Sequence, residues 1–127
     1  MSNIIRTGII GYGLSGRVFH APFIDILDGF ELSSISTSRE DNIKLASKRY
    51  PSAVIVPNGD GIINNPEIDL VIVTSPNTDH FKWAKEALKS GKHVVVEKPF
   101  TVTVEEADEL IELSEKVNKV LTVYHNR

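Results

Sequence analysis

The chain has 127 residues, of which 41% are hydrophobic and 24% charged, and its formal net charge at pH 7 is −3. This length suits one domain with its own hydrophobic core, and the acidic balance argues against a nucleic-acid-binding protein. The absence of cysteine excludes disulfides and thiolate sites, and no apolar run approaches the roughly 18 residues of a membrane span.

Apolar runs of strand length alternate with helical patterns along the chain. The first run, residues 4–10, is interrupted at residues 6–8, which excludes a signal peptide and leads us to expect a cytoplasmic protein. Six strands are predicted, at residues 4–10, 30–37, 53–56, 70–74, 93–97 and 120–124. Helices are predicted at residues 14–27, 43–50, 79–90 and 103–118.

Two helix ends carry recognisable signals. Thr103 followed by Glu106 is a capping box at the start of the last helix, and Gly91 takes the position just after the helix at 79–90. Strands that alternate with helices predict an α/β fold with a doubly wound parallel sheet of six strands, in the order 3-2-1-4-5-6. Residues 1–127 then form one dinucleotide-binding domain of the Rossmann type.

A glycine-rich segment, IIGYGLSG at residues 9–16, follows the first strand. Gly11 would allow a tight turn, Gly13 would let the backbone approach a pyrophosphate, and Gly16 would let the next helix pack closely on the sheet. The N-terminus of that helix would then face the phosphates with its free N–H groups. The alternative is a glycine-rich turn that binds no ligand.

The end of the second strand distinguishes NADP from NAD. It reads Thr37-Ser38-Arg39, with no carboxylate to bond a ribose 2′-hydroxyl. A guanidinium and two hydroxyls suit a 2′-phosphate, so NADP is predicted and NAD is the less favoured cofactor. In the alternative, Arg39 is a solvated surface residue and Glu40 or Asp41 binds the ribose.

Two further loops lie at the carboxyl edge of the predicted sheet. The loop at residues 74–80 follows the fourth strand, and Glu97-Lys98-Pro99 follows the fifth. Lys98 is a candidate to contact substrate, because its ammonium can bond a substrate oxygen and favour a developing alkoxide. The alternative for Lys98 is a solvated surface charge.

The segments GYGLSGRVFHAPF, VIVTSPNTDHFKWAKEALKSGKHVVVEKPF and VYHNR together resemble the Gfo/Idh/MocA oxidoreductase family over nearly the whole chain. The FHAP and YHNR segments look most like its NADP-dependent scyllo-inositol dehydrogenase branch. The resemblance implies a dehydrogenase that moves hydride between nicotinamide and a cyclic polyol or sugar-like alcohol, with Lys98 as the catalytic residue. It also implies a second, substrate-binding and oligomerisation domain, absent from this chain, so we expect the chain alone to be inactive and the full-length form to be a homo-oligomer.

The expected cofactor-binding residues come from the glycine segment, the second strand end, the two later loops and the chain end. They are Gly11, Tyr12, Gly13, Leu14, Ser15, Gly16, Thr37, Ser38, Arg39, Thr74, Ser75, Pro76, Asn77, His80, Glu97, Lys98, Pro99 and Asn126. The four histidines show no metal-ligand spacing, so no metal is expected. The competing hypothesis is a stand-alone nucleotide-binding module that regulates or binds a partner without turnover.

Overall fold

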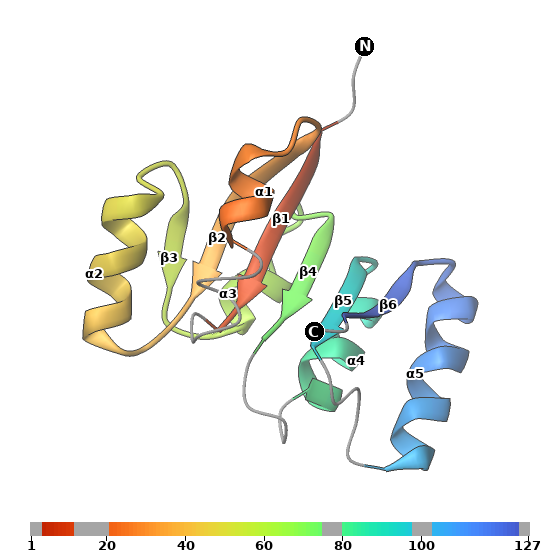
Figure 1. Cartoon of the computed structure of the whole chain (residues 1–127). Coiled ribbons are helices and arrows are strands. Elements are labelled where there is room, and N and C mark those ends of the chain that lie inside the picture. The colour runs from red at the N-terminus through yellow and green to blue at the C-terminus, as the bar shows by residue number, and fades with distance from the viewer. Residues whose placement is uncertain (1–3, 12–20, 75–79, 98–102, 125–127) are drawn as a thin grey trace.

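The computed structural model describes residues 4–11, 21–74, 80–97 and 103–124. Within them, six strands alternate with five helices (Figure 1). The strands are β1 (Ile5–Ile10), β2 (Phe30–Ser36), β3 (Val54–Val56), β4 (Leu70–Val73), β5 (His93–Glu97) and β6 (Leu121–Tyr124). The helices are α1 (Ala21–Ile26), α2 (Glu40–Arg49), α3 (Asp60–Ile63), α4 (His80–Lys89) and α5 (Val104–Val117).

All the strands pair in parallel, in the order β3-β2-β1-β4-β5-β6, which confirms the predicted sheet. The chain winds outward from β1 to β3 and then crosses over to β4, so the direction of winding reverses between β1 and β4. In sheets of this kind, ligands bind at the carboxyl ends of the strands beside that reversal.

The helices form a layer on each face of the sheet, and successive residues of β1 face opposite layers. Ile9 packs in one core with Ile24 of α1 and Ala46 of α2. Ile10 packs in the other core, which includes Leu110 of α5 and residues of α3 and α4. Both faces of the central strands are therefore buried, which explains why their sequences are apolar runs without alternation.

Two helices differ from the sequence prediction. α3 was not predicted, and its fully buried Ile62 packs against β1 at Gly8, where an added Cβ would lie 2.6 Å from Ile62 Cγ2. α2 begins at Glu40 and not at residue 43, so Glu40 and Asp41 lie in its first turn. The predicted start of the first helix lies outside the described residues.

The helix ends follow local rules. Thr103 caps α5, since its Oγ1 accepts a hydrogen bond of 3.1 Å from the Glu106 N–H, as predicted. Gly91 follows α4 with a φ of 82°, and Asn118 ends α5 with a φ of 58°. These left-handed residues let the following N–H groups return to the last turn of each helix.

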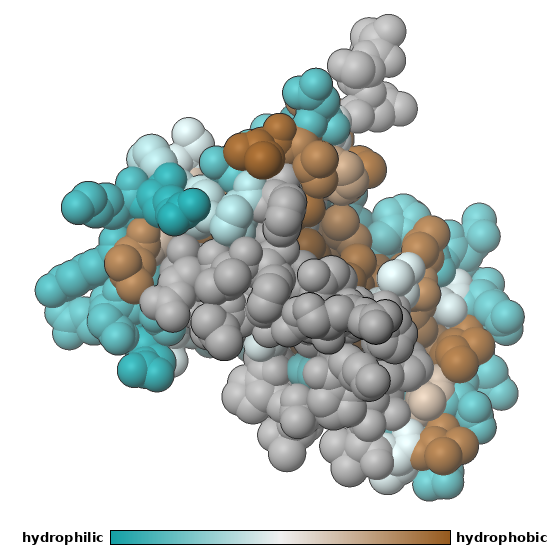
Figure 2. Space-filling view, viewed as in Figure 1, coloured by the Kyte–Doolittle hydropathy of each residue, from teal (hydrophilic) through white to brown (hydrophobic). Residues whose placement is uncertain are grey.

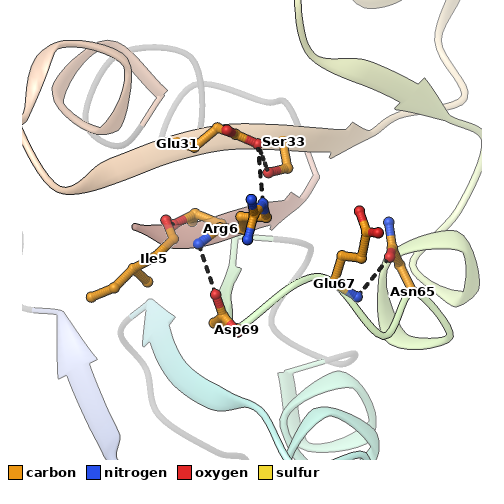
Figure 3. Close-up of polar contacts among 8 residues, drawn as sticks. Ile5, Arg6, Glu31, Ser33, Asn65, Glu67 and Asp69 are labelled. Carbon is orange, nitrogen blue, oxygen red and sulfur yellow. Dashed lines mark hydrogen bonds and ion pairs between the residues drawn. The ribbon is translucent and has the colours of Figure 1, made fainter. Parts of the chain in front are cut away.

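At the amino edge of the sheet, polar contacts tie neighbouring strands together (Figure 3). The Arg6 N–H donates to Asp69 Oδ2 at 3.0 Å, beside the start of β4. The Arg6 guanidinium lies 3.7 Å from Glu31 of β2, whose carboxylate also accepts from Ser33 Oγ. None of the predicted site residues belongs to this group. In the described part of the chain, no helix is long and apolar enough to cross a bilayer.

Candidate functional site

Four predicted site residues that are far apart in sequence share one row of the sheet. Ile10 pairs with Ser36 of β2 and with Val73 of β4, and Val73 pairs with Val96 of β5. The next residue on each strand therefore lies at the carboxyl edge, where the arrows of β1, β2 and β4 end together in Figure 1. In spatial order the row is Thr37, Gly11, Thr74 and Glu97.

Gly11 stands at the centre of this row, where the chain leaves β1. Its φ is 95°, a conformation that only glycine adopts without strain. Its N–H donates to both the carbonyl oxygen and the Oγ of Ser36, at 3.0 and 3.1 Å. On the other side, Thr74 Oγ1 lies 2.9 Å from the Gly11 carbonyl oxygen and 3.0 Å from that of Ile10. The backbone at Gly11 is thus held from both neighbouring strands.

The end of β2 presents the three residues predicted to choose the cofactor. Thr37 is buried, its N–H donates to the Val56 carbonyl at 3.0 Å, and its Oγ1 accepts from the Arg39 N–H at 3.4 Å. Ser38 is exposed. Arg39 takes the N-cap position of α2 but its side chain makes no capping bond, and Asp41 Oδ1 accepts from the Asn42 N–H at 3.0 Å. Arg39 is therefore placed beside the first N–H groups of α2, which have no partner within the helix itself.

The charged groups beside Arg39 bear on its preference for a ligand. Its guanidinium, 74% exposed, lies 3.6 Å from the Asp41 carboxylate, and Lys44 Nζ lies 3.8 Å from Glu40. Together these four residues line an open depression of about 560 Å³ at the start of α2. Figure 2 shows hydrophilic side chains gathered over this helix. The depression offers two cations to a phosphate, but also two carboxylates that compete for them.

The remaining predicted residues divide into described and undescribed positions. His80 begins α4 and is buried, with 1% of its surface exposed, and Glu97 ends β5 opposite Tyr124 of β6. The others lie outside the described residues. These are Tyr12, Gly13, Leu14, Ser15, Gly16, Ser75, Pro76, Asn77, Lys98, Pro99 and Asn126.

Sequence reasoning missed two contacts of this edge, the bond from the Gly11 N–H to the Ser36 hydroxyl and the pairing of Asp41 with Arg39. The signal for Ser36 is a serine at the buried end of β2, because a buried hydroxyl needs a partner. The sequence indicates Asp41 only as an alternative ligand for the ribose, and nothing around it indicates its pairing with Arg39. Among the described residues no group of three could hold a metal ion. His93 Nδ1 accepts a hydrogen bond of 3.0 Å from the Val120 N–H, which engages that nitrogen within the sheet.

Comparison with known proteins gives the chain a family context. A family model described as an oxidoreductase family with an NAD-binding Rossmann fold matches residues 5–125. An uncharacterised oxidoreductase of Escherichia coli K12, YdgJ, is 46% identical over the whole chain. The scyllo-inositol 2-dehydrogenase (NADP(+)) IolW of Bacillus subtilis is 45% identical over 97% of it. The chain spans 36% and 34% of the lengths of these two relatives.

Solved structures agree with the fold. An oxidoreductase-like protein from Bacteroides fragilis superposes with a TM-score of 0.94 at 46% identity, over 98% of this chain and 38% of that one. The 3-ketoreductase KijD10 of Actinomadura kijaniata, in complex with NADP, has a TM-score of 0.87 at 26% identity. That superposition covers 95% of this chain and 38% of KijD10.

Proposed function

The chain belongs to the Gfo/Idh/MocA oxidoreductase family, and from this premise we propose that it is the NADP-binding domain of a polyol or sugar dehydrogenase. The proposed substrate is a cyclic polyol or sugar-like alcohol of the inositol type, as in the name of the Bacillus relative. Other relatives are named as dehydrogenases of a D-glucoside and of UDP-N-acetylglucosamine, which supports an alcohol on a saturated ring as the common class. A cytoplasmic location and a homo-oligomeric full-length enzyme complete the proposal.

The described residues fit a dinucleotide at the carboxyl edge. Gly11 supplies the turn that a pyrophosphate loop needs, and Arg39 supplies a cation at the N-terminus of α2. When bound, the cofactor supplies a nicotinamide ring that accepts or donates a hydride. We assign the pyrophosphate to residues 11–16, and the 2′-phosphate to Thr37, Ser38 and Arg39. The nicotinamide half is assigned to Thr74, Ser75, Pro76, Asn77, His80, Glu97, Lys98, Pro99 and Asn126.

The position of Arg39 at the N-terminus of α2 is the observation that supports NADP over NAD. A 2′-phosphate beside Arg39 would accept charge-assisted hydrogen bonds from the guanidinium and hydrogen bonds from the N–H groups of Glu40 and Asp41 at the start of α2. Asp41, 3.6 Å away, weakens this attraction but does not abolish it, because exposed charges interact by only about 1 kcal/mol at such distances. In the competing arrangement, Asp41 accepts the ribose 2′-hydroxyl of NAD.

Titration of the chain with NADPH and NADH tests the choice of cofactor. Wild type should bind NADPH more tightly. Arg39→Ala should weaken NADPH binding about 10- to 100-fold, the equivalent of one charge-assisted contact, and should leave NADH binding within twofold. Asp41→Asn should strengthen NADPH binding by up to about fivefold. Arg49→Ala, at the far end of the same helix, is the control for loss of one positive charge.

Two outcomes would count against NADP. Equal affinities of wild type for NADPH and NADH would remove the assigned role of Arg39. If Asp41→Asn weakens NADH binding and leaves NADPH binding unchanged, the carboxylate binds the ribose, and the domain prefers NAD.

Lys98 is assigned the catalytic role, as the residue that follows Glu97 at the end of β5. Its ammonium would donate a hydrogen bond to the reacting oxygen and stabilise the developing alkoxide. In the full-length enzyme, Lys98→Ala should lower kcat by several orders of magnitude and leave NADPH affinity within a few-fold. Near-normal turnover by Lys98→Ala would contradict the catalytic role and favour the alternative, in which Lys98 is a solvated surface charge.

The chain spans about 36% of the length of its relatives, and turnover needs more than a dinucleotide site. It needs a base for the alcohol proton, a substrate held about 3–3.5 Å from the nicotinamide carbon, and a wall that excludes water. Our assignments supply none of these three requirements in full. They supply one contact with the substrate, the hydrogen bond from Lys98 to the reacting oxygen. We therefore expect this chain to bind NADP+ without using it to oxidise inositols or aldoses. Steady change in nicotinamide absorbance with the chain alone would contradict that expectation.

A further inference from the structure

Gly11 is held by two hydroxyl groups that come from the strands on either side of β1. Ser36, 3% exposed, accepts the Gly11 N–H at its Oγ, and Thr74 donates its hydroxyl proton toward the Gly11 carbonyl. These two contacts, which we call the Gly11 clamp, join residues that are 25 and 63 positions apart. Both peptide groups of Gly11 are thereby oriented from neighbouring strands.

The clamp acts on a residue that would otherwise have the most conformational freedom. Glycine populates positive and negative φ about equally, and Gly11 has a φ of 95°. A hydrogen bond on each side restricts the peptide planes before and after its Cα. The two contacts therefore restrict the φ and ψ of Gly11 in the free chain.

We propose that Ser36 and Thr74 are positioning residues for the dinucleotide, which act by holding Gly11 in its positive-φ conformation. This inference rests on the proposed function, since Gly11 opens the segment assigned to the pyrophosphate. The clamp reduces the number of backbone conformations that Gly11 adopts in the free chain. A larger fraction of the chains is then in the conformation that binds the ligand. When only a fraction of the chains is competent to bind, the apparent dissociation constant rises by the inverse of that fraction.

The same sheet contains two buried hydroxyls that serve as matched controls. Ser34 lies two residues before Ser36 on β2, is 2% exposed, and donates to the Val54 carbonyl at 2.9 Å. Thr7 on β1 is fully buried and donates to the Ile5 carbonyl at 3.3 Å. Both make hydroxyl-to-backbone contacts away from Gly11. Their removal should lower stability without moving the turn.

The first experiment measures NADPH and NADH affinity by fluorescence titration, with urea unfolding of each variant in parallel. Thr74→Val should weaken binding of both cofactors about five- to tenfold, whereas Thr74→Ser should stay within twofold of wild type. Ser36→Ala should weaken binding about two- to threefold, because the Ser36 carbonyl still accepts the Gly11 N–H. Ser34→Ala and Thr7→Val should bind as wild type does.

The valine and serine variants separate positioning from general stability. Thr74→Val keeps the side-chain shape and loses the hydroxyl, whereas Thr74→Ser loses a methyl group and keeps the hydroxyl. If Thr74→Val and Ser36→Ala, whose side chain is assigned no ligand contact, both lose affinity, the clamp positions Gly11 for the ligand. If only Thr74→Val loses affinity, Thr74 acts by direct contact with the cofactor and the proposal is overturned. If affinity follows the free energy of unfolding, or if the controls lose affinity equally, the proposal is overturned. Should Thr74→Val fail to fold, the pair Ser36→Ala and Ser34→Ala decides between these outcomes.

A second measurement needs no cofactor. Amide hydrogen exchange at Gly11 in the free chain should accelerate about two- to threefold in Ser36→Ala, which loses one of the two acceptors of that N–H, relative to Ser34→Ala and Thr7→Val. Unchanged exchange at Gly11 would overturn the clamp. Failure of wild type to bind NADPH or NADH would instead overturn the proposed function. The two failures are therefore distinguishable.

Discussion

Lys92 offers a quantitative test of how the amino edge of the sheet is held. This lysine is 3% exposed and follows Gly91 in the turn between α4 and β5. Its Nζ donates to the carbonyl oxygens of Asn65 and Ile68, at 2.7 and 2.8 Å, in the connection between α3 and β4. Burial lowers the pKa of Lys92 below its ordinary value of 10.5, and the nearby Asp69 carboxylate opposes this shift.

Lys92→Met removes both donors and keeps most of the side-chain volume. Each bond from a charged donor contributes about 1.5–3 kcal/mol, but the buried ammonium also costs several kcal/mol of desolvation that methionine avoids. We therefore expect Lys92→Met to lower the free energy of unfolding by about 1–3 kcal/mol at pH 7. The control is Lys89→Met, at an exposed position in the last turn of α4, which should stay within about 0.5 kcal/mol of wild type.

The pH dependence has a definite sign. Because the folded-state pKa of Lys92 is lowered, the unfolded chain binds more protons between that pKa and 10.5. The stability advantage of wild type over Lys92→Met should therefore grow as pH rises through this window, where neutral Nζ still has two N–H donors. Urea unfolding at pH 7, 8, 9 and 10 measures it. Equal stability at pH 7, or an advantage that shrinks with rising pH, would refute the reasoning.

Three further substitutions test local packing and helix ends, each by urea unfolding. Gly8→Ala should cost about 1–3 kcal/mol, because its Cβ would lie 2.6 Å from Ile62 Cγ2, and Ile62→Ala in the same chain should relieve part of this strain. Thr103→Ala should cost about 1 kcal/mol through loss of the cap on the Glu106 N–H, and Thr103→Ser should restore it. Asn118→Ala should cost about 1 kcal/mol at a φ of 58°, whereas Asn118→Gly should be near neutral; equal effects of alanine and glycine would contradict this.

The sequence was least informative between residues 57 and 69. The letters NGDG at residues 58–61 are typical of a turn, and a helix as short as α3 has no periodicity to detect. α3 forms because Ile62 and Ile63 are buried against the sheet, which is a tertiary interaction. The early start of α2 was missed for a related reason, since Arg39 at its N-cap makes no side-chain capping bond.

The candidate site was predicted in its parts but not in its internal contacts. Gly11, Thr37 and Arg39 were identified by their place after strands and by their chemistry. That Arg39 faces Asp41, and that Thr74 bonds the Gly11 carbonyl, could not be inferred from spacing. Such contacts depend on side-chain rotamers and on loop geometry, which local sequence specifies weakly.

The sequence by itself determined the six strands and the ends of α4 and α5, because these depend on apolar runs and on capping residues within a few positions. The strand order was predicted from the alternation of strands with helices along the chain. Only the tertiary structure decided which residues meet across the sheet. The row of Thr37, Gly11, Thr74 and Glu97 follows from strand register, and the burial of Lys92 follows from the approach of two distant connections. Register is set by the packing of both helical layers at once. No single segment contains that information, because the contacts that stabilise it join residues as many as 64 positions apart.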